Sequence, residues 1–260
     1  AVPDEVLRHL NITREQADAR FRRWIAGLWF APNELRQRAR KELALTGMYV
    51  PYWTYDSDTT SDYTGLRGVY YWVTQTYTTV VNGRTVIRTR QVRHTRWYPA
   101  AGTVSNRFDD ILILASRSLP RRYTEELEPW DLENLVPYAD AYLSGFRAET
   151  YQVELDEGFQ MAAAIMNEHI RQSIRRHIGG DEQRILSVRT RYHNITFKHV
   201  LLPVWLSAYR YRDRVFRFLV NARTGEVQGE RPWSVLKIAL AVLAALAAIA
   251  AIAALASHAQ

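Results

Sequence analysis

The sequence predicts an α+β protein in which helices pack on antiparallel sheets, followed by one C-terminal transmembrane helix. Two long segments show helical periodicity, and aromatic-rich segments typical of strands lie after each of them. Residues 238–256 contain no charged side chain. The chain is 47% hydrophobic and 12% aromatic, which indicates a folded protein rather than a disordered one.

The composition excludes several kinds of site. The 260 residues include no Cys, so disulfides, thiolate zinc sites and cysteine nucleophiles are absent from this sequence. The net charge is +7, and all but three of the 34 basic residues are Arg. A basic protein suits anionic headgroups and also nucleic acid. The first ten residues lack the apolar stretch of a signal peptide, and we expect no leader there.

Residues 1–46 are predicted to form a helical segment. Thr13 and Gln16 have the spacing of a capping box at a helix start. Pro32 ends this helix, and Asn33 is expected to cap a second helical piece that runs to Gly47. The apolar stripe of the first helix is Ala17, Phe21, Trp24, Ile25 and Leu28.

Residues 47–120 are predicted to form a first antiparallel β unit with a long hairpin. Residues 48–55 are aromatic and extended, and residues 107–116 are expected to form a further, separate strand. Asn82-Gly83 is a strong two-residue turn signal. It pairs residues whose numbers sum to 165, so Tyr71 faces His94 and Trp72 faces Arg93.

This hairpin is rich in arginine and in aromatic residues. Such a ribbon can bind single-stranded nucleic acid, lie against anionic headgroups, or use its arginines only for cross-strand packing on the rings. The candidate anionic-surface contacts are Arg84, Arg88, Arg90, Arg93, His94 and Arg96. The candidate docking aromatics are Trp53, Tyr71, Trp72, Tyr77 and Trp205.

Residues 121–231 are predicted to form a second α+β unit, entered through an acidic connection at residues 120–137. Residues 146–155 are expected to be a strand, followed by an amphipathic helix that ends at Gly179-Gly180. Strands are expected at 184–197, 200–211 and 215–220, with a hairpin turn at 221–225. The helical stripe is Phe159, Ala162, Met166, Ile170 and Ile174.

A short segment is repeated within the chain. Val50-Pro51-Tyr52-Trp53 is similar to Leu202-Pro203-Val204-Trp205, and each follows a long helical segment. The repetition predicts two related halves, each with a helix on an antiparallel sheet, in the manner of cystatin-like or PepSY-like units.

Residues 234–256 are predicted to be a transmembrane helix. The nineteen uncharged residues from 238 would cover roughly 28 Å as a helix, close to the hydrocarbon thickness of a bilayer. Lys237 is expected to snorkel to the headgroups. Basic residues precede the span and none follows it, which predicts a single pass through the inner membrane with the body in the cytoplasm. The predicted anchor residues are Trp233, Lys237, Ile238, Leu246 and Leu255.

The candidates for chemistry are few. The aspartates at 56, 58 and 62 could surround a hard cation, but their spacing is not that of an EF-hand. His169 and His177 lack an HExxH context. Asp109 and Asp110 are expected to point to opposite faces of a strand. We therefore predict no catalytic residue, no metal site and no cofactor.

Four stretches resemble a known family: MYVPYWTYDSDTTSDYTGLRG, RFDDILILAS, LEPWDLENLVPYADAYLSGFRAE and LLPVWLSAYRYRDRVFRFLVNARTGEVQGERPWS. They are similar to bacterial membrane-anchored zinc-ribbon proteins, often named primosomal protein N′ (replication factor Y)-like or helicase-like. The resemblance covers roughly residues 47–237, and it implies a scaffold at the inner face of the membrane beside band-7 (flotillin-like) proteins.

This chain departs from the family in two respects. It has no Cys, so no zinc ligand can be carried over, and the ribbon is either absent or precedes Ala1. The phosphate-binding Gly-x-x-x-x-Gly-Lys-Ser/Thr loop of a helicase is also absent.

The expected function is therefore that of a non-enzymatic, membrane-anchored cytoplasmic adaptor active in membrane-stress organisation. The expected partners are the lipid bilayer, membrane-associated proteins and further copies of the chain in a homo-oligomer. The alternative is a nucleic-acid-binding replication accessory protein.

Overall fold

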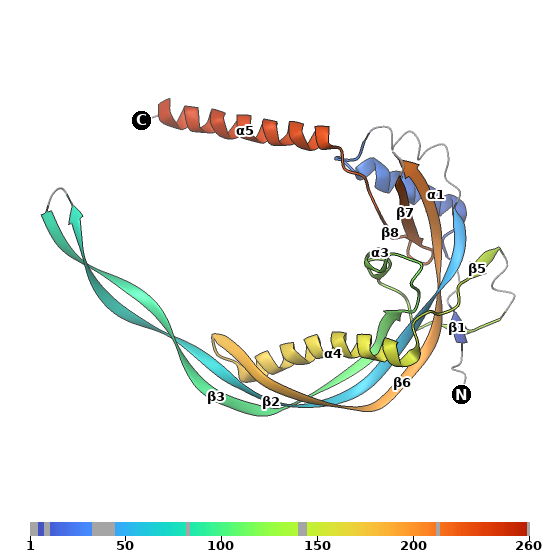
Figure 1. Cartoon of the computed structure of the whole chain (residues 1–260), viewed down its shortest axis with the longest axis horizontal. Helices are drawn as coiled ribbons and strands as arrows, with labels where there is room; N and C mark the ends of the chain where they lie inside the picture. The colour runs from blue at the N-terminus through green and yellow to red at the C-terminus, as the bar shows by residue number, and fades with distance from the viewer. Residues whose placement is uncertain are drawn as a thin grey trace. The chain divides into compact units, whose positions relative to one another are not determined.

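The computed structural model describes residues 5–7, 11–32, 45–81, 84–139, 145–211 and 214–258, and it confirms an α+β fold with one C-terminal apolar helix. Figure 1 shows the elements in their order along the chain. They are β1 (Glu5–Leu7), α1 (Arg14–Gly27), β2 (Thr46–Val81), β3 (Arg84–Leu114), α3 (Arg121–Glu125), β4 (Val136–Pro137), β5 (Phe146–Ala148), α4 (Leu155–Ile178), β6 (Glu182–Tyr211), β7 (Arg214–Asn221), β8 (Val227–Gly229) and α5 (Val235–His258).

The chain forms two compact units that draw on alternating segments. Unit 1 contains residues 1–53, 114–154 and 198–260, and unit 2 contains residues 54–113 and 155–197. The boundary expected near residue 120 falls within unit 1, so the compact units are not consecutive halves of the sequence.

The strands belong to one sheet in the order β3-β2-β6-β1-β4, with β7 and β8 continuing from β6. The β6–β7 and β7–β8 pairs are antiparallel. Two short strands add parallel pairs, because β1 pairs with β6 and β5 pairs with β2. The predicted turn at residues 221–225 is confirmed by hydrogen bonds from the Asn221 amide to the Glu226 carbonyl and from the Gly225 amide to the Asn221 carbonyl.

Three strands are longer than the sequence patterns predicted. Residues 48–55 and 107–116 are not separate strands, because the first segment is the start of β2 and most of the second is the end of β3, which lie next to each other at the open end of the hairpin. Residues 184–197 and 200–211 likewise belong to the single strand β6. The expected strand at 146–155 is reduced to β5, because residues 152–153 instead donate backbone hydrogen bonds to Ala115.

The hairpin register predicted from Asn82-Gly83 is confirmed by hydrogen bonds between facing residues of β2 and β3. Thr103 donates to Asp62 at 2.7 Å, and Thr59 donates to the Asn106 carbonyl at 3.2 Å, and both pairs sum to 165. The turn residues themselves lie outside the described residues. So does most of the second helical piece expected from Asn33, of which residues 33–44 are not described.

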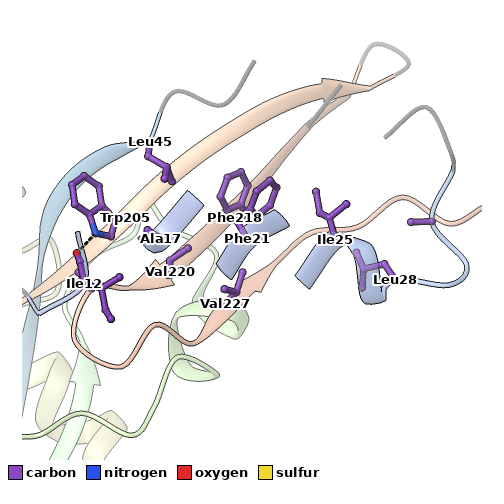
Figure 2. Close-up of a cluster of buried hydrophobic side chains, with 12 residues drawn as sticks. Ile12, Ala17, Phe21, Ile25, Leu28, Leu45, Trp205, Phe218, Val220 and Val227 are labelled. Carbon is purple, nitrogen blue, oxygen red and sulfur yellow. Dashed lines mark hydrogen bonds between the residues drawn. The ribbon is translucent and has the colours of Figure 1, made fainter. Parts of the chain in front are cut away.

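The core of unit 1 forms where α1 packs on β6 and β7. The capping box is confirmed, because the Gln16 amide donates to the Thr13 hydroxyl and the Thr13 amide donates to the Gln16 side chain. The rings of Phe21 and Phe218 lie against each other (Figure 2), with centroids 3.6 Å apart. Ala17 and Ile25 are buried on the same helix face, as the apolar spacing predicted.

In unit 2 the long helix α4 packs on strand residues. The Tyr55 hydroxyl donates to the Leu155 carbonyl at 2.7 Å, at the first residue of α4. Near its other end, the Tyr63 hydroxyl lies 3.1 Å from Nδ1 of His177. The helix ends as predicted, because Gly179 and Gly180 both have positive φ, which terminates helical geometry at little cost for glycine.

The two Pro-x-Trp segments make matching side-chain hydrogen bonds. The indole nitrogen of Trp53 donates to the Val153 carbonyl at 2.8 Å, and that of Trp205 donates to the Ile12 carbonyl at 2.9 Å. Each acceptor lies two residues before the start of a helix, α4 in the first case and α1 in the second. The Trp205 bond is drawn in Figure 2.

The backbone around each tryptophan repeats as well. The carbonyl of each proline accepts from an alanine amide, and the carbonyl of that alanine accepts from two consecutive amides just before a helix. The first set is Pro51, Ala115, Gln152 and Val153, and the second is Pro203, Ala222, Asn11 and Ile12. This shared pattern places the start of each helix in the same way.

The helices are exchanged between the two halves of the sequence. Helix α1 precedes β2 along the chain, yet its start is bound by Trp205 of β6 and it packs on β7. The start of α4, which precedes β6, is bound by Trp53 of β2. The buried positions of α1 (Ala17, Phe21, Ile25) and of α4 (Gly158, Ala162, Met166) follow the two carbonyl acceptors at the same spacing of five, nine and thirteen residues.

Candidate functional site

Helix α5 is long and apolar enough to cross a membrane. The eighteen residues Val235–Ile252 have a mean hydropathy of 2.6, and none of them is buried. Ile238 and Leu246 are 38% and 57% exposed. The side chain of the third predicted apolar anchor residue, Leu255, lies outside the described residues.

The first turn of α5 is hydrogen-bonded to the loop that follows α1. The Ser234 hydroxyl accepts from the Lys237 amide at 3.4 Å, which caps the helix. The Ser234 amide donates to the Phe30 carbonyl at 2.8 Å. The Lys237 ammonium, expected to reach toward headgroups, instead donates to the carbonyls of Ala31 at 2.8 Å and Trp29 at 3.3 Å.

Large aromatic side chains lie around the start of α5. Trp29 is 78% exposed and Trp233 is 55% exposed. The rings of Phe30 and Trp233 lie 6.3 Å apart. The sequence analysis identified Trp233 as an anchor residue but did not identify Trp29 and Phe30. The sequence feature that points to these two is a pair of consecutive aromatic residues directly after an amphipathic helix.

Two pockets flank the base of α5. One has a volume of about 460 Å³ and the other about 580 Å³. The first is mostly apolar, whereas the second contains two arginines and one carboxylate. The first is lined by Trp29, Phe30, Lys237, Leu240 and Ala241, and the second by Tyr123, Arg214, Phe216, Glu230, Arg231, Pro232 and Trp233.

The outer part of the β2–β3 hairpin, residues 69–81 and 84–96, forms an exposed ribbon. Strand β6 begins at Glu182, and the Ser61–Thr190 and Thr64–Ser187 contacts set a register that pairs Glu182 with residue 69. From residue 70 outward, the described part of β2 therefore pairs with β3 alone.

The six predicted basic residues of this ribbon are all exposed, and several of them contact aromatic rings. Arg93 lies over Tyr70 with its guanidinium carbon 4.2 Å from the ring centroid. The ring of Tyr71 stacks on His94 with centroids 5.6 Å apart, and the guanidinium carbon of Arg96 lies 4.9 Å from the Tyr71 centroid. The remaining members of the predicted set are Arg84, Arg88 and Arg90, of which Arg90 lies 5.7 Å from the Tyr77 ring.

The predicted docking aromatics separate into two groups. Tyr71, Trp72 and Tyr77 are 38%, 59% and 42% exposed on the ribbon. Trp53 and Trp205 are only 2% and 8% exposed. This corrects the expectation for those two tryptophans, because their indoles are buried and engaged in the helix-start hydrogen bonds.

The aspartates occupy separate sites along β2. Asp62 contacts Arg191 at 2.9 Å, and Asp58 accepts from Asn194 at 2.9 Å. Asp56, Asp58 and Asp62 thus have different partners. Asp56 instead approaches Asp109 and Asp110, and one carboxylate oxygen from each of these three lies within 4.8 Å of the others.

The expectation that Asp109 and Asp110 point to opposite faces is wrong. Asp110 has φ of 51°, which breaks the alternation of side chains along a strand. The Asp110 amide donates to Asp56 at 2.8 Å, and Thr196 donates to the same Asp56 carboxylate at 2.7 Å. Both oxygens of the Asp56 carboxylate therefore accept hydrogen bonds from within the protein.

The predicted histidines also have separate surroundings. The ring of His169 meets Phe108 edge-on with centroids 6.2 Å apart, whereas His177 contacts Tyr63. A third histidine, His199, is buried in unit 1 and packs against the rings of Trp53 and Tyr151, with centroids 4.9 and 5.5 Å away. Burial lowers the pKa of His199 below its usual range. Nothing in the sequence pattern distinguished this residue.

Comparison with known proteins identifies a similar chain in Bacillus subtilis (strain 168), named uncharacterized protein YdjG. The two are 26% identical over 244 residues, which cover 88% of this chain and 64% of the relative. This chain thus spans less than two thirds of the length of that relative. No protein-family profile matches the chain. No solved structure matches it either.

Proposed function

We propose that this protein is a non-enzymatic adaptor, anchored in a membrane by α5, that presents the β2–β3 ribbon to partner proteins. The observation that carries the proposal is α5, in which none of the eighteen residues Val235–Ile252 is buried although the helix is strongly apolar. Exposing such a surface to water is unfavourable, and a bilayer would cover it.

The ribbon is the surface best suited to a protein partner. A two-stranded ribbon is only marginally stable alone, and both of its edges carry unpaired backbone groups. It also exposes large apolar side chains, including Trp72, Val80 and Ile87 at 59%, 67% and 72%. A partner that adds a strand or covers these side chains would stabilise it.

The orientation follows from charge. Arg223, Arg231 and Lys237 precede the span within about twenty residues. The positive-inside rule then places the folded units in the cytoplasm, at the inner membrane. The partners would be membrane-associated proteins, for which the resemblance to zinc-ribbon proteins implies the band-7 class.

Membrane anchoring is tested by flotation. The full chain is expected to float with neutral phosphatidylcholine vesicles and to resist extraction by high salt, whereas a chain that ends at Glu230 is expected to stay in solution. A full chain that remains soluble would overturn the proposal.

The docking role of the ribbon is tested by site-specific photo-crosslinking in membranes. A crosslinker at Trp72 is expected to capture the same defined protein repeatedly, whereas one at Arg171, exposed on α4, is expected not to capture it. Equal capture at both positions would contradict a docking role.

A nucleic-acid-binding role is the second candidate, favoured by the arginines on the ribbon. Single-stranded DNA would stack on its rings while the guanidinium groups contact phosphates. This alternative predicts binding with a steep salt dependence that is lost in Arg88→Glu with Arg90→Glu. DNA binding that is unchanged in the Arg88→Glu with Arg90→Glu variant would exclude the ribbon as the DNA-binding site. The cystatin-like or PepSY-like origin of the two halves stays a prediction.

A further inference from the structure

The base of α5 combines cationic and apolar surfaces on adjoining sides. The pocket of about 580 Å³ holds Arg214 and Arg231, and the pocket of about 460 Å³ is walled by Trp29 and Leu240. The Phe30–Trp233 ring pair, 6.3 Å apart, contributes one ring to each pocket, so the two pockets are neighbours. Both volumes lie within the range typical of small-molecule sites, about 300–1,000 Å³.

We infer that this surface is a specific site for one anionic phospholipid. The headgroup phosphate binds between Arg214 and Arg231, and the beginning of the acyl region lies against Trp29, Phe30 and Leu240. The inference rests on the proposed insertion of α5 into a bilayer, because only then do the pockets face lipid.

Both arginines are positioned by aromatic rings. The guanidinium carbon of Arg231 lies 4.7 Å from the centroid of Trp233, and that of Arg214 lies 5.9 Å from the centroid of Phe216. A guanidinium that rests on a ring keeps its N–H donors free at the edge, where they can bind phosphate oxygens in pairs. The rings thus limit the side-chain freedom that each arginine would lose on binding.

The net charge of the pocket favours an anionic headgroup over a zwitterionic one. Glu230 is the only acidic residue among the lining residues, and two arginines outweigh it by one positive charge. One oxygen of the Glu230 carboxylate accepts a hydrogen bond from the Arg217 amide at 3.4 Å, so part of its hydrogen-bonding capacity is used by the backbone. A phosphatidylcholine headgroup would bring its own cation to this cationic pocket, whereas phosphatidylglycerol would not.

A lipid fits better than a free phosphate because the site continues into the proposed span. Val235 and Leu236 are 81% and 70% exposed immediately after Trp233. Lys237 is bound to the carbonyls of Trp29 and Ala31. The positive charges that contact the headgroup at the base of α5 are therefore Arg214 and Arg231. The apolar pocket beside them contributes to binding only if the ligand has a hydrocarbon part, as a lipid does.

The test is native mass spectrometry of the full chain in detergent, titrated with short-chain phosphatidylglycerol, short-chain phosphatidylcholine or inorganic phosphate. One phosphatidylglycerol is expected to bind in preference to phosphatidylcholine, and inorganic phosphate is expected neither to bind nor to compete. Arg214→Gln with Arg231→Gln should weaken phosphatidylglycerol binding by roughly fivefold for each arginine removed. Trp29→Ser with Phe30→Ser should weaken both lipids alike.

The matched control removes the same charge elsewhere. Arg171→Gln with Arg175→Gln changes two exposed arginines of α4 and is expected to leave phosphatidylglycerol binding unchanged. Equal loss in both double variants would show a general charge effect and overturn the site, as would binding of both lipids with equal affinity. Flotation of the full chain on neutral vesicles separates the two proposals, because its failure would overturn the anchor itself.

Discussion

The indole of Trp205 links β6 to the start of α1. Its bond to the Ile12 carbonyl is 2.9 Å long and buried, so the carbonyl has no access to solvent as a substitute partner. Trp205→Phe keeps most of the ring but removes the donor. Leaving a buried carbonyl unsatisfied costs about 1–3 kcal/mol.

We expect Trp205→Phe to lower the free energy of unfolding by that amount, and Trp53→Phe to have a similar effect through Val153. Urea denaturation followed by circular dichroism measures the change. Trp72→Phe, on the exposed ribbon, is the control and should alter stability by less than about 0.5 kcal/mol. Equal effects at all three positions would mean that the indole hydrogen bonds contribute nothing specific.

His199 should make stability depend on pH. Because burial lowers its pKa in the folded state, the unfolded chain binds a proton near pH 6.5 while the folded chain does not. The unfolded state therefore holds more protons in this range, and stability falls as the pH drops from about 7.5 toward the lower folded-state pKa.

The measurement is the slope of unfolding free energy against pH. His199→Gln is expected to flatten this slope below pH 7, whatever its effect on absolute stability. Carboxylates also titrate at the acidic end, so the informative quantity is the difference between wild type and variant. An unchanged slope in His199→Gln would refute the assignment.

At the scale of elements, the ribbon is defined by its register. Thr74 and Gln91 face each other, with the Gln91 side-chain nitrogen 3.1 Å from the Thr74 hydroxyl. Thr74→Cys with Gln91→Cys is expected to form an intramolecular disulfide under mild oxidation, which non-reducing electrophoresis and mass spectrometry detect. Thr74→Cys with Arg90→Cys should not, because adjacent residues of β3 point to opposite faces. The natural absence of Cys makes the result unambiguous.

Much of the local structure was predictable because it depends on neighbouring residues. Short-range rules set the capping box at Thr13 and the apolar face and glycine end of α4. They also set the pairing of β2 with β3, in which the numbers of facing residues sum to 165. The length of the strands was not predictable, because polar residues such as Thr59 and Ser61 interrupt the apolar pattern. They are nevertheless buried, with hydrogen-bond partners on β3 and β6.

The candidate site was only partly predictable for a related reason. Residues 235–252 are recognisable from composition alone, and so are the ribbon arginines. The contact of Lys237 with residues 29 and 31 joins positions about two hundred residues apart in sequence. The pocket around Arg214 likewise needs Tyr123 and Arg231 brought together. Nor could periodicity reveal the positive φ of Asp110.

At the scale of the whole molecule, the units require both ends of the sequence. The core of unit 1 combines α1 with Trp205, Phe218 and Val220, which come from the far side of residue 120. A fragment of residues 121–260 would therefore expose these side chains. Burying large apolar residues is the main source of folding stability, so neither residues 1–120 nor residues 121–260 should fold alone.

Co-expression tests this dependence. The two fragments produced together are expected to associate and to recover the circular dichroism of the intact chain, whereas each fragment alone should aggregate or lack cooperative unfolding. Phe218→Asp in the second fragment is the control, because a charge opposite Phe21 should prevent association. A fragment that folded independently would contradict the exchange of helices.

That exchange has an evolutionary consequence. A chain with one helix and one hairpin of this kind would be incomplete by itself, yet two identical copies could complete each other by trading helices. Such a dimer becomes permanent when its gene is duplicated and fused, and the two copies are then free to diverge. In this protein the first half of the sequence carries the long arginine-rich ribbon, and the second half continues into the apolar tail.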